Sequence, residues 1–71
     1  MTIENFKQLP LHEKLLALRR SGELLGPYER NDANGGTKTP GDIYAVEDFY
    51  VYLSEDESIV VVSRRNPLPA E

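Results

Sequence analysis

The sequence contains no cysteine. This absence excludes disulfide bonds, thiolate metal sites and a cysteine nucleophile. A protein without disulfides fits a reducing compartment, so we expect a cytoplasmic location. The fold must then be held by packing and hydrogen bonds alone, in a chain of 71 residues.

Long apolar runs and an excess of basic residues are missing as well. No stretch is long enough to span a bilayer, and the first residues, MTIENFKQLP, lack the basic and then apolar pattern of a signal peptide. Twelve acidic residues stand against eight basic ones, which gives a net charge of −4 and an isoelectric point near 4.9. Nucleic-acid-binding proteins usually carry a basic patch and a high isoelectric point. The charge balance therefore disfavours a nucleic-acid partner, and we expect no membrane partner.

Residues that could carry chemistry are few. The one histidine, His12, is expected on the exposed side of a helix, and no serine or aspartate is placed to complete a triad with it. Residues 32–36, DANGG, begin like a calcium loop, but the twelfth position of that loop is Ile43 instead of glutamate. We therefore predict no catalytic, cofactor-binding or metal-binding residues, no small-molecule ligand and no enzymatic activity.

The chain does have the composition of a small globular domain. Apolar residues make up 39% of it and charged residues 28%. A domain of this size has a single core and a net stability of ~3–5 kcal/mol. We expect one domain over residues 1–65 and a flexible tail at residues 66–71, where NPLPAE contains two prolines and no strand or helix pattern.

The N-terminal third is predicted to be helical. Apolar residues in the first nine positions are spaced for one face of a short helix, and Pro10 suits the start of a second helix. In that second helix Leu11, Leu15 and Leu18 are predicted to form the buried stripe. Gly22 fits the left-handed position that often follows the last helical turn.

The remaining chain is predicted to form strands. Residues 23–30 read as a strand that Gly26 and Pro27 weaken, so it should lie at an edge or carry a bulge. Residues 31–41, NDANGGTKTPG, read as a surface loop with Asn34-Gly35 at its tip. Further strands are expected at residues 42–46, 49–53 and 59–63, with turns at 47–48 and 54–58. The fold class is therefore α+β, with one or two N-terminal helical segments packed on a three- to four-stranded antiparallel β-meander.

Two stretches resemble a known pattern. Residues 6–14, FKQLPLHEK, match F-x-x-L-P-L-x-E-K, and residues 43–53, IYAVEDFYVYL, match an apolar-Tyr-x-apolar-x-x-Phe-aromatic-Val-x-apolar pattern. In this order they resemble a family of short uncharacterised bacterial proteins. The resemblance implies a bacterial protein with a helix packed on a small antiparallel sheet, and it implies no activity. Residues 31–41 depart from the family's shorter turn, which leaves the pairing of residues 23–30 with 42–46 open.

The central strands are apolar or aromatic on both faces. A two-residue turn at 47–48 makes Val46 oppose Phe49, and the helix stripe should cover the face that carries Phe49. The second face is predicted to hold the candidate interface residues Ile43, Tyr50, Tyr52, Val60 and Val62. Tyrosine tolerates both water and burial and is enriched at interfaces. Two interpretations stay open: this face docks a partner, or residues 23–30 or the 31–41 loop cover it.

These features predict a small non-catalytic protein-interaction module of unknown pathway. We expect it to associate with itself through the sheet, as a homodimer, or to bind another protein. The alternative is a nucleic-acid-associated regulator that uses the arginine pairs Arg19, Arg20, Arg64 and Arg65.

Overall fold

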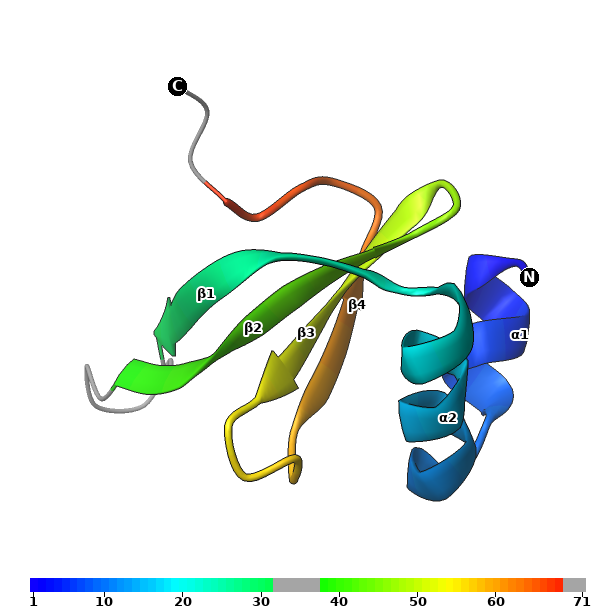
Figure 1. The fold of residues 1–71 in the computed structure, drawn as a ribbon, viewed down its shortest axis with the longest axis horizontal. Helices are drawn as coiled ribbons and strands as arrows, with labels where there is room; N and C mark the ends of the chain where they lie inside the picture. Colours follow the sequence, from blue (N-terminus) through cyan, green and yellow to red (C-terminus); the bar gives the residue numbers. More distant parts are fainter. Residues whose placement is uncertain (32–37, 69–71) are drawn as a thin grey trace.

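Two short helices precede a four-stranded antiparallel sheet in the computed structural model, which describes residues 1–31 and 38–68 (Figure 1). The strands lie side by side in the order β1-β2-β3-β4. This arrangement confirms the α+β fold with a four-stranded meander. The elements are α1 (Ile3–Gln8), α2 (Leu11–Ser21), β1 (Glu23–Asn31), β2 (Lys38–Val46), β3 (Phe49–Ser54) and β4 (Val60–Ser63).

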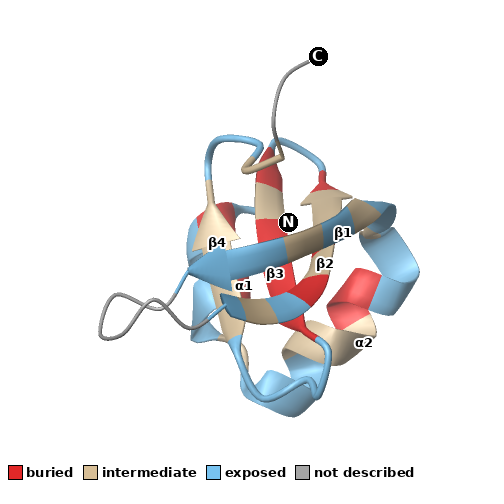
Figure 2. Ribbon diagram, turned by 90° about the vertical axis from the view of Figure 1, so that its left-hand side faces the viewer, coloured by how far each residue is buried: buried red, intermediate tan, exposed pale blue. Residues whose placement is uncertain are grey.

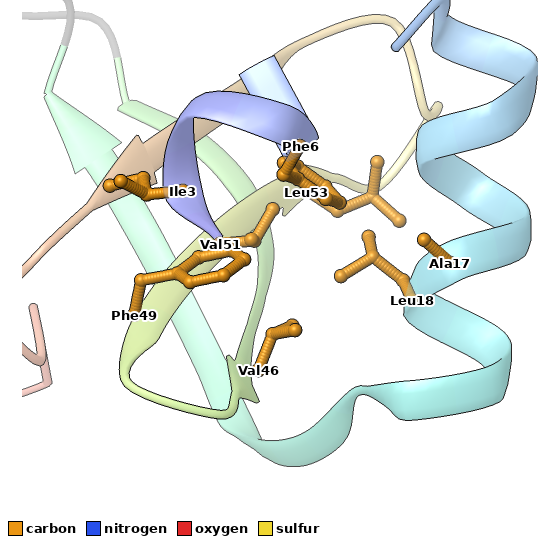
Figure 3. Close-up of a cluster of buried hydrophobic side chains, with 8 residues drawn as sticks. All are labelled: Ile3, Phe6, Ala17, Leu18, Val46, Phe49, Val51 and Leu53. Carbon is orange, nitrogen blue, oxygen red and sulfur yellow. The ribbon is translucent and has the colours of Figure 1, made fainter. Parts of the chain in front are cut away.

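The buried side of α2 differs from the predicted stripe. Its buried residues are Ala17 and Leu18, and Leu15 is half-buried against the core. Leu11 is 44% exposed, so its predicted burial is wrong. The first turn of α2 contributes no residue to the buried cluster, to which α1 contributes Ile3 and Phe6 (Figure 3).

Gly22 ends α2 in an extended conformation, with φ −85° and ψ 142°, instead of the predicted left-handed one. Its N–H donates a hydrogen bond to the Leu18 carbonyl oxygen at 2.8 Å. A Cβ on Gly22 would lie 2.5 Å from the same oxygen. Space rather than backbone conformation therefore favours glycine here, and the chain passes directly from α2 into β1.

β1 and β2 pair along their whole length. The register runs from Glu23 opposite Ala45 to Asn31 opposite Lys38, which confirms the pairing that the sequence left open. A bulge lies between Leu24 and Gly26, where Gly26 has φ 155°, as the Gly-Pro sequence predicted. The predicted loop at 31–41 is too long, because strand pairing continues through residues 38–41 despite their turn-forming composition. The predicted loop tip at residues 34–35 lies outside the described residues.

The β2–β3 turn has the predicted register, but the β3–β4 turn does not. Val46 opposes Phe49 across the two-residue turn. In the next turn, the Ser54 N–H donates to the Ile59 carbonyl at 3.0 Å, so only residues 55–58 lie between the paired ends. Val60 then opposes Leu53, and by the same register Val62 opposes Val51.

This register overturns the predicted position of Val60 and Val62. Both were expected on the second face, yet both pack against the core on the first face. The predicted turn was one residue too long, and a slip of one residue moves every side chain of a strand to the opposite face. Asp56 fixes the shorter turn: it accepts hydrogen bonds from the Ser54 hydroxyl at 2.8 Å and from the Ser58 hydroxyl at 2.7 Å.

The core lies between the helices and the first face of the sheet (Figure 3). The rings of Phe6 and Phe49 meet at its centre, with centroids 5.6 Å apart and planes tilted by 53°. The buried cluster consists of Ile3, Phe6, Ala17, Leu18, Val46, Phe49, Val51 and Leu53. The first face is thus closed by apolar side chains from both helices.

Candidate interaction surface

β1 covers much of the second face of the sheet. It runs across the view in front of β3 and β4 (Figure 2), and the ring of Tyr28 meets the ring of Tyr52 edge-on at 6.0 Å between centroids. Ile43 is completely buried and Tyr52 is only 4% exposed. One of the two open interpretations is therefore confirmed in part, because residues 23–30 do cover this face.

Gly41 makes room for this arrangement. It lies opposite Tyr28 in the β1–β2 register, and the Tyr52 ring from β3 packs over it. A Cβ on Gly41 would lie 2.6 Å from the Tyr52 ring and would also collide with the Leu53 carbonyl oxygen. The Tyr52 hydroxyl donates to the carbonyl oxygen of Thr39 at 2.8 Å and lies 3.3 Å from that of Pro40. Burial raises the pKa of Tyr52, while the nearby Arg30 guanidinium opposes that rise.

A groove of about 200 Å³ remains open beside Tyr52. Half-buried Tyr28 and Tyr50 form part of its walls, and Val61 of β4, which opposes Tyr52, forms another part. The complete lining in the described part of the chain is Tyr28, Arg30, Tyr50, Tyr52, Val61, Ser63 and Pro67. The groove therefore joins residues from β1, β3, β4 and the segment after β4.

The structure brings together only some of the predicted interface residues. Tyr50 and Tyr52 line the groove, whereas Ile43 is completely buried and does not line it. Val60 and Val62 are on the other face, for the reason given above. Sequence reasoning missed Val61 because of the one-residue register error, and it missed Tyr28 because it did not place β1 over the sheet.

The segment after β4 contains two local turns. The Ser63 hydroxyl donates to the Arg65 carbonyl oxygen at 2.9 Å and accepts from the Arg65 N–H at 3.2 Å. The Asn66 side-chain oxygen accepts from the Leu68 N–H at 3.0 Å. Pro67, the middle residue of the second turn, lines the groove and is half-buried, as is Leu68. The flexibility predicted for residues 66–71 stays a prediction, and residues 69–71 lie outside the described ones.

The two edges of the sheet differ in how they are protected. β1 carries a bulge, Pro27 and charged residues, all of which hinder pairing with another strand. β4 has the sequence VVVS and contains neither charge nor proline. Ile59, just before it, is 37% exposed. The Ser54 N–H donates to the Ile59 carbonyl oxygen across the β3–β4 pair. In an antiparallel pair, residues whose backbone groups face the partner strand alternate with residues whose groups face away from it. The N–H and C=O groups of Val60 and Val62 therefore face away from β3.

Arg64, one of the four arginines of the nucleic-acid alternative, lies among acidic residues. Arg64 makes an ion pair with Glu4, with 3.1 Å between Nη2 and Oε1, and lines a hollow that also contains Glu47 and Asp48. Such neighbours weaken the attraction of an arginine for a polyanion. The nucleic-acid alternative stays a prediction, and salt-dependent retention on a nucleic-acid resin would test it.

Other chemical sites receive no support from the described ranges. His12 is exposed, as expected. Within residues 1–31 and 38–68, no group of three or more His, Cys, Asp or Glu side chains could hold a metal ion. Neither helix in the described ranges is long and apolar enough to cross a membrane.

No family model, curated protein or solved structure matches this chain. The resemblance to a family of short bacterial proteins therefore stays a prediction. The groove and the β4 edge are interpreted below from their own chemistry.

Proposed function

We propose that this protein is a small non-catalytic interaction module that associates with itself through the open edge of β4. The observation that carries the proposal is the contrast between the two edges of the sheet. β1 is guarded by a bulge, a proline and charges, while β4 presents β-branched residues with outward-facing backbone groups. An antiparallel pair of β4 strands from two copies would join the two sheets and satisfy these groups.

The expected association is weak. A standard interface buries roughly 800 Å² on each partner, about one-sixth of the 5103 Å² surface of this chain. The edge of a four-residue strand offers much less than that, so we expect the contact to include Ile59 as well. We therefore expect an equilibrium between monomer and dimer that depends on protein concentration.

Sedimentation at a low and a high protein concentration tests this proposal. The informative variant is Ile59→Lys, since a lysine beside an edge strand opposes strand pairing and costs an exposed site little. The matched control is Leu24→Lys, which adds the same charge on β1 at a side chain that is 58% exposed. We expect the wild type and Leu24→Lys to dimerise at high concentration and Ile59→Lys to stay monomeric. A wild type that is monomeric at both concentrations, or an Ile59→Lys variant that dimerises like the wild type, would refute the β4 contact.

A further inference from the structure

One of the chain's own prolines forms part of the wall of the groove beside β4. Pro67 lines the groove together with Tyr50 and Val61, and it arrives there through the side-chain turns of Ser63 and Asn66. These hydrogen bonds begin at Ser63, the last residue of β4, and order residues 64–68, which have no helix or strand structure. A proline-containing segment of the chain therefore borders the same open space as the three tyrosines.

The lining has the chemistry that recognises such a segment. Proline-rich chains in the polyproline II conformation dock into grooves lined by aromatic side chains, because the proline ring packs on an aromatic face. Proline also has no N–H, so its burial leaves no backbone donor without a partner. Tyr28, Tyr50 and Tyr52 supply three aromatic rings within one groove. A cavity of about 200 Å³ suits one or two side chains of a docked segment, and it is smaller than the ~300–1,000 Å³ typical of small-molecule sites.

We propose that this groove binds an extended, proline-containing segment of a partner protein, and that Pro67 is a resident competitor for the same place. The proposal goes beyond self-association, which uses the edge of β4. It assigns the interaction module a second surface and names the chemistry of its ligand.

Charge adds a preference to this recognition. Arg30 is the one charged side chain among the groove residues in the described ranges. An acidic residue near the proline of the ligand would complement it, with modest strength because the pair is exposed to solvent. The chain's own last six residues, NPLPAE, combine two prolines with a terminal glutamate and provide a suitable probe peptide.

The resident segment should lower the apparent affinity for an added peptide. A protein whose binding-competent state is populated only in part binds its ligand more weakly by that fraction. If Pro67 fills its place nine-tenths of the time, removing it should strengthen peptide binding about tenfold. Pro67→Ala in the full chain makes this change without touching the sheet.

The experiment is a titration of the ¹⁵N-labelled full chain with the synthetic peptide NPLPAE, followed by amide chemical shifts. The control peptide is NALAAE, in which both prolines are replaced. We expect saturable shifts at Tyr28, Tyr50 and Val61 with the first peptide and at least tenfold weaker binding of the second. Pro67→Ala should bind NPLPAE about tenfold more tightly than the wild type. Tyr50→Ala should lose binding, while Leu11→Ala, which removes an exposed apolar side chain elsewhere, should bind like the wild type.

Several outcomes would overturn the proposal. Chemical shift changes that do not saturate, or that map outside the groove, would refute the binding site. This part of the test uses the wild-type protein, so it remains valid even if Tyr50→Ala does not fold. Equal binding of the two peptides would refute proline recognition. Unchanged affinity in Pro67→Ala would refute the resident competitor. Failure here is distinguishable from failure of the proposed self-association, because Ile59→Lys should abolish dimerisation and keep peptide binding, whereas Tyr50→Ala should do the reverse.

Discussion

The two faces of the sheet are covered in different ways. Helices cover the first face, and the side chains that meet there are apolar, with the Phe6 and Phe49 rings in contact. A strand of the same sheet covers the second face, where the meeting side chains are Tyr28 and Tyr52. Both contacts are between aromatic rings, but only the second involves residues with a polar end.

This difference explains why the second face keeps an open groove beside its covering strand. A helix presents a broad stripe of side chains, while a strand such as β1 presents alternate residues only and leaves its neighbours uncovered. Tyr52 can be buried because its hydroxyl bonds to the backbone of β2, and Tyr50 can line an open groove because tyrosine tolerates water. The second face therefore combines partial burial with a surface that is available for binding.

The largest expected effect comes from breaking the first face. Phe6→Ala removes a fully buried ring, which costs ~3–5 kcal/mol. That is comparable to the whole stability of a domain of this size, so the variant should be largely unfolded. Leu11→Ala, at the exposed start of α2, is the control and should melt close to the wild type. Circular dichroism during urea denaturation measures both, and a well-folded Phe6→Ala variant would show that α1 is not part of the core.

A smaller effect is expected from overfilling the second face. Gly41→Ala places a Cβ against the Tyr52 ring and the Leu53 carbonyl, and overpacking of this kind costs ~1–3 kcal/mol. Combining it with Tyr52→Leu should cost less than the sum of the two single changes, because the ring that the new Cβ strikes is gone. The free energies of unfolding of the four proteins form a double-mutant cycle. Strict additivity would mean that Tyr52 does not lie over Gly41 in solution.

The smallest effect concerns the polar end of the second-face contact. Tyr52→Phe leaves the Thr39 and Pro40 carbonyls without their hydroxyl donor and should cost ~1 kcal/mol at pH 7. Tyr50→Phe, on the open part of the same strand, is the control and should change stability very little. Equal losses in the two variants would argue against the hydrogen bond from Tyr52.

The same residue predicts a pH dependence. Burial raises the pKa of Tyr52 above its ordinary value of 10.0, so the unfolded chain releases this proton first as the pH rises. The contribution of Tyr52 to the free energy of unfolding is therefore complete below pH 10.0. It declines as the pH rises from there through the pKa of Tyr52 in the folded protein. We expect the free energy of unfolding to fall less between pH 8 and a pH above 10 in Tyr52→Phe than in the wild type, as measured by urea denaturation. An identical decline would place its source elsewhere.

Local patterns in the sequence predicted the elements better than their contacts. Helix spacing and the turn at residues 47–48 were sufficient for the helices, the strand order and the pairing of Val46 with Phe49. The β3–β4 register could not be read in the same way, because Ser54 belongs to the strand by its hydrogen bonds and to the turn by its composition. That single residue decided which face Val60 and Val62 occupy.

The groove required tertiary information that the sequence does not display. Tyr28 stands in a segment with glycine and proline, GPYER, and nothing local indicates that this segment lies over β3. Gly41 was read as part of a loop, although its role is to make space for a ring from another strand. Gly41 follows the general rule that a glycine inside a strand can mark a close approach, which a sequence pattern alone does not connect to a partner.

The central claim is that β1 closes the second face through Tyr28 and leaves the groove beside it. Nuclear Overhauser contacts between the ring protons of these tyrosines test it most directly, in the full chain at neutral pH. The account predicts contacts between Tyr28 and Tyr52, whose ring centroids lie 6.0 Å apart. A Tyr52 ring that shows contacts to Ile43 and Val61 but none to Tyr28 would mean that β1 does not cover this face, and would contradict the account.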